Sequence, residues 1–201
     1  MVDLRPKILV GVLAVQGDFA EHQEALHRAG VGTRQVRVPS DLEAVDGLVL
    51  PGGESTTMWK LLDLQGLSDP VLALVRTGLP VLATCAGLIL LASDVVDPTQ
   101  PSFGVLDVTT ARNGYGRQIH SGTFPLEGES LPAGAEGVFI RAPRILRVGP
   151  GVEVLARWSG DPVLVRSGLV LAACFHPELQ EGHFVTDIFV DLLRTAHSAI
   201  P

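Results

Sequence analysis

Short apolar runs that alternate with helical patterns through the first half of the chain constrain its fold most strongly. The predicted strands are Lys7–Val15, Thr33–Val38, Gly47–Leu50 and Leu79–Ala83. The predicted helices run from Asp18 to near Gly30 and over Ser55–Leu62, Asp69–Arg76 and Ala86–Ala92, and Ser40 with Glu43 opens a further short helix. Asp18 with Glu21 resembles a capping box at the start of the first helix. This alternation predicts a parallel, doubly wound sheet.

The pattern changes from about Val105, where strand-like pieces follow one another with little helix between them. We expect these pieces at 105–111, 117–124, 135–140, 152–157, 162–166 and 169–175, before a closing helix over Phe184–Ala196. With 201 residues, of which 46% are hydrophobic, the chain can build one sizeable core. We therefore expect a single domain over residues 1–201, with a mostly parallel central sheet and extra antiparallel strands in its second half.

Charge and hydropathy disfavour several classes of protein. A net charge of −7 without a Lys/Arg cluster disfavours nucleic-acid binding, which needs a basic face. Two cysteines, Cys85 and Cys174, do not make a disulfide scaffold. The uncharged stretch Thr77–Ser93 contains Gly78 and Pro80 and is shorter than the ~20 residues of a membrane helix. The apolar start is followed by polar residues without a cleavage signal, so we expect a cytoplasmic protein with no membrane partner.

Cys85 lies at the centre of PVLATCAGLILLA, residues 80–92. Free cysteine is commonly a small core residue. The alternative is a nucleophile on a sharp strand–turn–helix elbow, which needs small neighbours such as Ala83, Ala86 and Gly87. A helix beginning directly after the thiol would stabilise its thiolate. This segment alone leaves both interpretations open.

His176 and Glu178 follow a predicted buried strand in GLVLAACFHPEL. Pro177 restrains His176 to an extended conformation, in which residues i and i+2 point the same way. Glu178 is then expected to reach the imidazole nitrogen that does not face Cys85, as a Cys–His–carboxylate relay requires. A zinc site using Cys174 and His176 lacks a further ligand pair at metal spacing, and Cys174 fits the core better.

Two further kinds of segment are candidates for substrate contacts. PGGES, residues 51–55, is either a plain Gly-rich turn or a loop whose Gly53 N–H faces an oxyanion together with that of Ala86. Arg112 and Arg117, in ARNGYGRQIHSGT, and Arg141, in VFIRAP, are either solvated or able to clamp a substrate carboxylate.

Taken together, GVLAVQG, PGGESTT, TCAGLILLA, RNGYGRQ, FIRAP and FHPEL resemble the glutaminase subunits of pyridoxal 5′-phosphate synthases. These subunits are class I, triad-type glutamine amidotransferases. The resemblance implies a three-layer α/β/α flavodoxin-like fold and hydrolysis of L-glutamine to L-glutamate and ammonia. Cys85 would form a γ-glutamyl thioester, His176 would protonate the departing ammonia, and Glu178 would orient His176.

The resemblance also implies a substrate site and a partner. The expected glutamine-binding residues are Gly53, Glu54, Ser55, Arg112, Ile140 and Arg141. Ammonia would pass to a synthase subunit within a large hetero-oligomer, and the glutaminase itself would need no cofactor and no metal.

The sequence departs from the family pattern at Ala83, where glycine is usual, at Cys174, where threonine is common, and at His120–Gly122. Two other functions stay open: a self-contained cysteine peptidase or amidase, which would act without a partner, and a non-catalytic module on the same fold. We further hypothesise that the Gly52–Gly53 peptide gates activity, because glycine tolerates a positive φ and its peptide rotates easily.

Overall fold

The computed structural model describes residues 8–115 and 121–198, and Arg117 and His120 lie outside them. Its central sheet has seven strands in the order β10-β11-β12-β4-β3-β1-β2. Five are parallel: β1 (Leu9–Leu13), β2 (Gly32–Val36), β3 (Gly47–Leu50), β4 (Val81–Thr84) and β12 (Val170–Ala173). The antiparallel strands β10 (Glu153–Trp158) and β11 (Asp161–Ser167) extend one edge. The predicted combination of parallel and antiparallel strands is confirmed.

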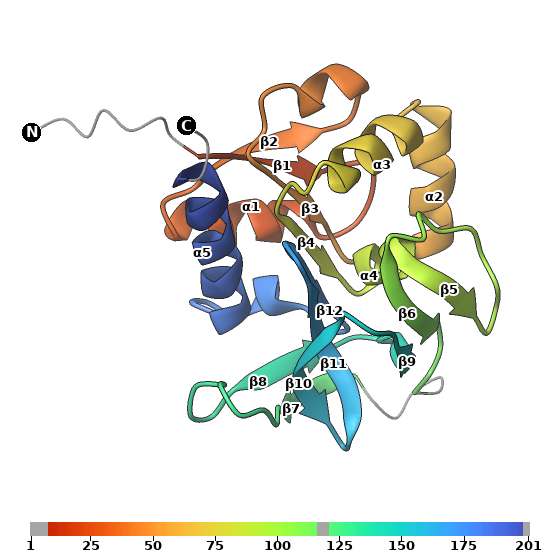
Figure 1. Ribbon diagram of the computed structural model, residues 1–201, viewed down its shortest axis with the longest axis vertical. Helices are drawn as coiled ribbons and strands as arrows, with labels where there is room; N and C mark the ends of the chain where they lie inside the picture. The colour runs from red at the N-terminus through yellow and green to blue at the C-terminus, as the bar shows by residue number, and fades with distance from the viewer. Residues whose placement is uncertain (1–7, 116–120, 199–201) are drawn as a thin grey trace, which may run out of the picture.

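Helices cover both faces of this sheet, as Figure 1 shows. One face carries α1 (Phe19–Arg28) and α5 (Phe184–Ser198), and the other carries α2 (Ser55–Leu64), α3 (Ser68–Arg76) and α4 (Ala86–Leu91). The central strands β3 and β4 carry apolar side chains toward both helical layers, so they are buried along their whole length. The predicted three-layer α/β/α, flavodoxin-like fold is confirmed.

Two small sheets lie beside the central one. The first contains β5 (Ala92–Val96), β6 (Leu106–Ala111) and β9 (Arg144–Val148), and the second pairs β7 (Gly122–Pro125) with β8 (Glu136–Phe139). Strands β5 and β9 were not predicted, and the predicted strand 117–124 is described only from residue 121 onward, where β7 begins at Gly122. The short helix expected at Ser40 is the 3-10 turn η1 (Pro39–Leu42).

The structure accommodates Ala83 without a visible irregularity. Ala83 is fully buried in β4, where it pairs in regular register with Leu50 of β3 and Ala172 of β12. Cys174, directly after β12, is also fully buried and belongs to the core. The extra methyl at Ala83 therefore leaves the strand before Cys85 intact.

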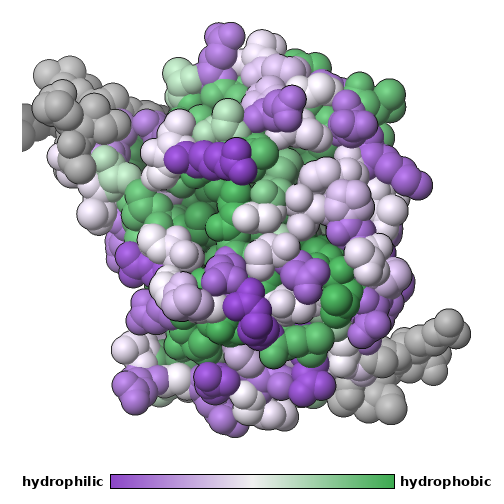
Figure 2. Space-filling model, turned by 45° about the vertical axis from the view of Figure 1, so that its right-hand side comes forward, coloured by the Kyte–Doolittle hydropathy of each residue, from purple (hydrophilic) through white to green (hydrophobic). Residues whose placement is uncertain are grey.

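The surface is mixed, with apolar side chains visible between polar ones on the face drawn in Figure 2. The large exposed apolar residues include Ile140 and Leu179. Within residues 8–115 and 121–198, no helix has the length and apolar character needed to cross a bilayer.

Candidate active site

Cys85 occupies a sharp turn between β4 and α4 at the carboxyl end of the central strands. Its backbone has φ +47° and ψ −101°, a strained conformation that non-glycine residues rarely adopt. The strand holds it there, since the Cys85 N–H donates to Ala173 O at 2.8 Å. A Cβ at Gly87 would lie 2.0 Å from Leu50 O, so only glycine lets α4 approach β3 this closely. These features form the strand–turn–helix elbow that the small residues predict.

His176 lies between the end of β12 and the turn η2 (Pro177–Leu179), and Glu178 lies within η2. The His176 N–H donates to Val138 O of β8 at 2.8 Å, and its Nδ1 lies 2.8 Å from Glu178 Oε1. Both side chains are almost fully enclosed. The chain makes this contact through a 3-10 turn rather than through the extended backbone we expected, because Pro177 starts η2. The predicted pairing of the two side chains is present all the same.

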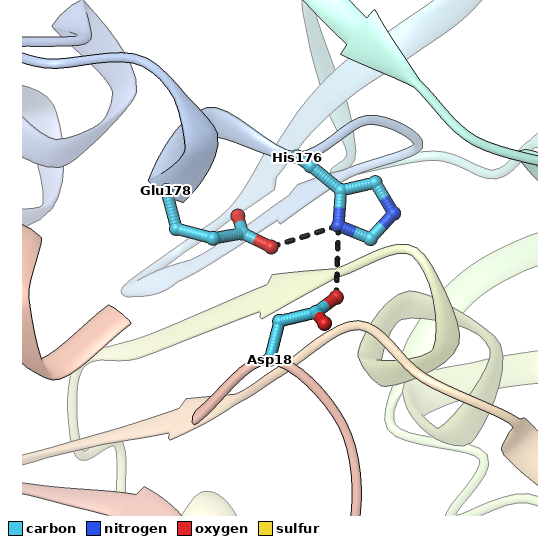
Figure 3. Close-up of side chains that lie close together, drawn as sticks. All are labelled: Asp18, His176 and Glu178. Carbon is cyan, nitrogen blue, oxygen red and sulfur yellow. Dashed lines mark hydrogen bonds and ion pairs between the residues drawn. The ribbon is translucent and has the colours of Figure 1, made fainter. Parts of the chain in front are cut away.

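Asp18 is a second carboxylate at the same imidazole, and sequence reasoning did not predict it. Its Oδ2 lies 3.3 Å from His176 Nδ1, and Figure 3 shows both carboxylates directed at that nitrogen. The expected capping role of Asp18 is wrong, since its side chain makes no cap hydrogen bond with α1. Its N–H donates to Gly52 O at 3.2 Å, and at φ −85°, ψ 41° it lacks the extended backbone typical of a capping residue.

His22 also contacts this group, one helical turn after Asp18. Its Nε2 lies 3.0 Å from Thr84 Oγ1 and 3.3 Å from Glu178 Oε2. Asp18 directly precedes α1 and His22 lies in its first turn, so the spacing of four residues brings both side chains to the same side of the helix. That Asp-x-x-x-His spacing after the first strand is the signal that could have identified them.

The charges in this group stabilise one another. Burial alone would lower the pKa of His176, but hydrogen bonds with Asp18, Cys85 and Glu178 outweigh it and raise that pKa above its ordinary range. Burial would raise the pKa of Glu178, but the hydrogen bond with His176 and the charge of its imidazolium hold that pKa below the usual value. The hydrogen bond with His176 likewise lowers the pKa of Asp18. The site therefore favours an imidazolium at His176 between the ionised carboxylates of Asp18 and Glu178.

A cavity of about 320 Å³ opens beside Cys85 and His176. It is lined by all six of the predicted glutamine-binding residues, Gly53, Glu54, Ser55, Arg112, Ile140 and Arg141. Asp18, Ile89 and Asn113 also line it, and these three were not predicted. The structure thus brings the candidate nucleophile, the relay and the candidate substrate contacts to one place.

Within this cavity Glu54 and Arg112 already form an ion pair. Arg112 Nη2 lies 3.0 Å from Glu54 Oε1, and Glu54 also caps α2 by accepting from the backbone N–H groups of Thr56 and Thr57. Burial acts to raise the pKa of Glu54, yet these hydrogen bonds lower it to about 2. Ser55, in contrast, donates its hydroxyl to Gln100 Oε1 at 2.8 Å.

The loop before α2 approaches His176 closely. A Cβ at Gly52 would lie 2.3 Å from His176 Cε1, and one at Gly53, where φ is +154°, would lie 2.4 Å from Gln16 Oε1. Because Gly52 O accepts from the Asp18 N–H, the Gly53 N–H of the same trans peptide points away from that backbone. Ala86 begins α4, so its N–H has no acceptor within the helix.

The described residues also include one group that could ligate a metal. The ligand atoms of Asp18, His176 and Glu178 lie within 4.8 Å of one another. However, Nδ1 and Oε1 are already used in a hydrogen bond between His176 and Glu178, and Cys174 lies in the core. The arrangement suits proton transfer better than metal binding.

Comparison with known proteins agrees with this geometry. Residues 12–195 match the model of the SNO glutamine amidotransferase family. The chain is 48% identical to a pyridoxal 5′-phosphate synthase subunit PdxT of Thermotoga neapolitana, covering 92% of this chain and 99% of that protein. It is 50% identical to the subunit of the same name from Koribacter versatilis, covering 94% and 97%.

Solved structures give the same result at the level of the fold. One described as a glutamine amidotransferase has a TM-score of 0.85 and 49% identity, covering 92% of this chain and 98% of its own. Another, described as a GMP synthase component from Thermoplasma acidophilum, has a TM-score of 0.71 at 18% identity, covers 96% of each chain, and shares the fold. The chain belongs to the SNO glutamine amidotransferase family.

Proposed function

We propose that this chain is the glutaminase subunit of a pyridoxal 5′-phosphate synthase, which hydrolyses L-glutamine to L-glutamate and ammonia. The observation that carries the proposal is the buried His176–Glu178 pair beside Cys85 in a cavity of about 320 Å³. The relatives named as synthase subunits at 48% and 50% identity support the pyridoxal branch of the family.

In the proposed mechanism Cys85 is the nucleophile. Its thiolate attacks the side-chain amide carbon of glutamine, and the imidazolium of His176 gives a proton to the departing ammonia. The resulting γ-glutamyl thioester is cleaved by water, from which His176 takes a proton. Glu178 holds Nδ1 throughout, so that Nε2 stays directed at the reacting atoms.

The oxyanion of each tetrahedral intermediate would be bound by the N–H groups of Gly53 and Ala86. Glutamine would be held by Gly53, Glu54, Ser55, Arg112, Ile140 and Arg141. Arg112 has five N–H donors, and the ion pair with Glu54 leaves part of its fork available for the α-carboxylate of the substrate. The other two functions considered, a partner-independent peptidase and a non-catalytic module, gain no support from the family match.

The ammonia would be delivered to a synthase subunit within a large hetero-oligomer. The name that the relatives carry, a synthase subunit, supports such a partner. A single domain over residues 1–201 and a cytoplasmic location are part of the same proposal. We also propose that rotation of the Gly52–Gly53 peptide gates the oxyanion site.

The test is glutamate release from L-glutamine by the chain mixed with its cognate synthase subunit. Cys85→Ala is expected to lower the rate by at least ~10³-fold, because members of such a relay act as a unit. Equal rates for the wild type and this variant would exclude Cys85 as the nucleophile. If the wild-type complex released no glutamate, the proposed function itself would be wrong.

A further inference from the structure

His22 is a buried polar side chain that the mechanism above does not use. It lies in the first turn of α1, is 2% exposed, and contacts both Thr84 and Glu178. Thr84 is the residue directly before Cys85, and Glu178 is the carboxylate behind His176. One side chain therefore connects the strand that carries the nucleophile to the relay that acts on it.

The two carboxylate oxygens of Glu178 differ in their hydrogen bonding. Oε1 accepts from His176 Nδ1 at 2.8 Å, whereas Oε2 is fully buried and makes no hydrogen bond of standard geometry among the described residues. His22 Nε2 faces this second oxygen at 3.3 Å. A buried ionised carboxylate oxygen needs a positive or N–H neighbour, since its desolvation is otherwise costly.

The contact with Glu178 also indicates which ring nitrogen of His22 carries the proton. Burial lowers the pKa of His22 despite the neighbouring charge of Glu178, so its imidazole is neutral at neutral pH and carries one N–H. If that proton were on Nδ1, the Nε2 lone pair would face an ionised carboxylate and repel it. The contact with Glu178 thus selects the Nε2–H tautomer, whose proton lies between Thr84 Oγ1 and Glu178 Oε2.

We propose that His22 is a positioning residue for the glutaminase reaction, whose Nε2–H fixes the carboxylate of Glu178 and thereby the orientation of His176 toward Cys85. The inference rests on the proposed function, because it assigns His22 a role in that reaction. Without this N–H, Glu178 can rotate about its side-chain bonds, and the hydrogen bond to His176 Nδ1 loses its fixed geometry. Turnover then falls, while the glutamine contacts on the other side of the cavity stay as they are.

Two amide variants of matched polarity test this role in the complex with the synthase subunit. His22→Gln keeps an N–H donor near the position of Nε2, whereas the side chain of His22→Asn is one bond too short to reach Glu178 Oε2. We expect His22→Asn to lower kcat by about 10- to 100-fold, by analogy with the loss seen when the outer partners that orient metal-ligating side chains are removed. The KM for glutamine should change less than about twofold, and His22→Gln should recover most of kcat.

Several outcomes would overturn the proposal. They are an unchanged kcat in folded His22→Asn, a loss that appears in KM alone, or an equal loss in His22→Gln and His22→Asn. A measurement on the wild-type chain covers the case in which the variants do not fold: ¹⁵N NMR of labelled histidine must place the His22 proton on Nε2, and a proton on Nδ1 contradicts the proposal. Inactive wild-type complex would instead refute the proposed glutaminase function, and the NMR result would still decide the tautomer of His22.

Discussion

Replacing Asp18 by asparagine tests the electrostatic account of His176 most directly. Asparagine keeps the size and the backbone N–H that bonds to Gly52 O, and it removes one negative charge near Nδ1. Because Asp18 favours the imidazolium, the variant should lower the pKa of His176. In the proposed mechanism the protonated form of His176 donates the proton to the departing ammonia, so the basic limb of the pH profile of kcat/KM should move to lower pH.

The size of this shift follows from the 3.3 Å between Asp18 Oδ2 and His176 Nδ1. Two unit charges at this separation interact by about 1.3 kcal/mol in a medium like water and by about 5 kcal/mol at an effective dielectric constant of 20. The Asp18 side chain is 40% exposed, so solvent screening brings the effect toward the lower value. Since one pKa unit corresponds to about 1.36 kcal/mol, we expect a shift of about one pH unit.

Two measurements check this expectation. The first is the pH dependence of kcat/KM for glutamine in the complex, and the second is the NMR titration of His176 in the isolated chain. Asp63→Asn is the matched control, because Asp63 is exposed on α2 and leaves the local charges around His176 unchanged. If Asp18→Asn left both the basic limb and the His176 titration at the wild-type pH, Asp18 would not act on the imidazole as the distances indicate.

Three other changes give distinct results. Glu54→Gln should lower the free energy of unfolding above pH about 4.5, because the folded-state pKa of Glu54 is depressed to about 2. The difference from wild type should disappear as the pH falls toward about 2, and urea titrations at several pH values measure it. Arg112→Gln should raise the KM for glutamine by about 10- to 100-fold with kcat nearly unchanged, since it removes the charged hydrogen bond that we propose Arg112 makes to the substrate; steady-state kinetics would show this. Gly52→Ala should lower kcat by ~10²-fold, because its Cβ would lie 2.3 Å from His176 Cε1 and displace the ring; an unaltered kcat would contradict this geometry.

Much of the fold could be predicted because its strongest signals are local. The run Gly47–Leu50 is β3 with the predicted bounds, since continuous apolar residues bounded by turn residues favour a buried strand. Strand β5 was missed because Ala92–Val96 continues directly from the apolar helix α4, with no turn residue between them. Strand β9 was missed because Arg144–Val148 contains two arginines and lies in a small, half-exposed sheet.

In the site, too, contacts between residues close in the sequence could be predicted, whereas contacts between distant residues could not. Glu178 could be predicted to reach His176, because the two are only two residues apart around Pro177. The spacing of His22 from Asp18 could have marked it as a candidate, but its contact with Glu178 could not be predicted, because this contact joins residues far apart in the chain and depends on how α1 packs against η2. Asp18 was misread because an acidic residue before a helix already has a sufficient local explanation in capping.

The position of Asp18 also connects the charge on His176 to the hypothesis of a Gly52–Gly53 gate. The Asp18 N–H is bound to Gly52 O, and this bond holds the residue away from the capping conformation, with its carboxylate at His176. Rotation of the Gly52–Gly53 peptide would remove that acceptor and free Asp18 to turn toward the N–H groups of α1. Movement of the gate and the pKa of His176 are therefore expected to change together when the synthase subunit docks. Structures of the free and docked chain in which the peptide rotates while Asp18 stays against His176 would break this connection.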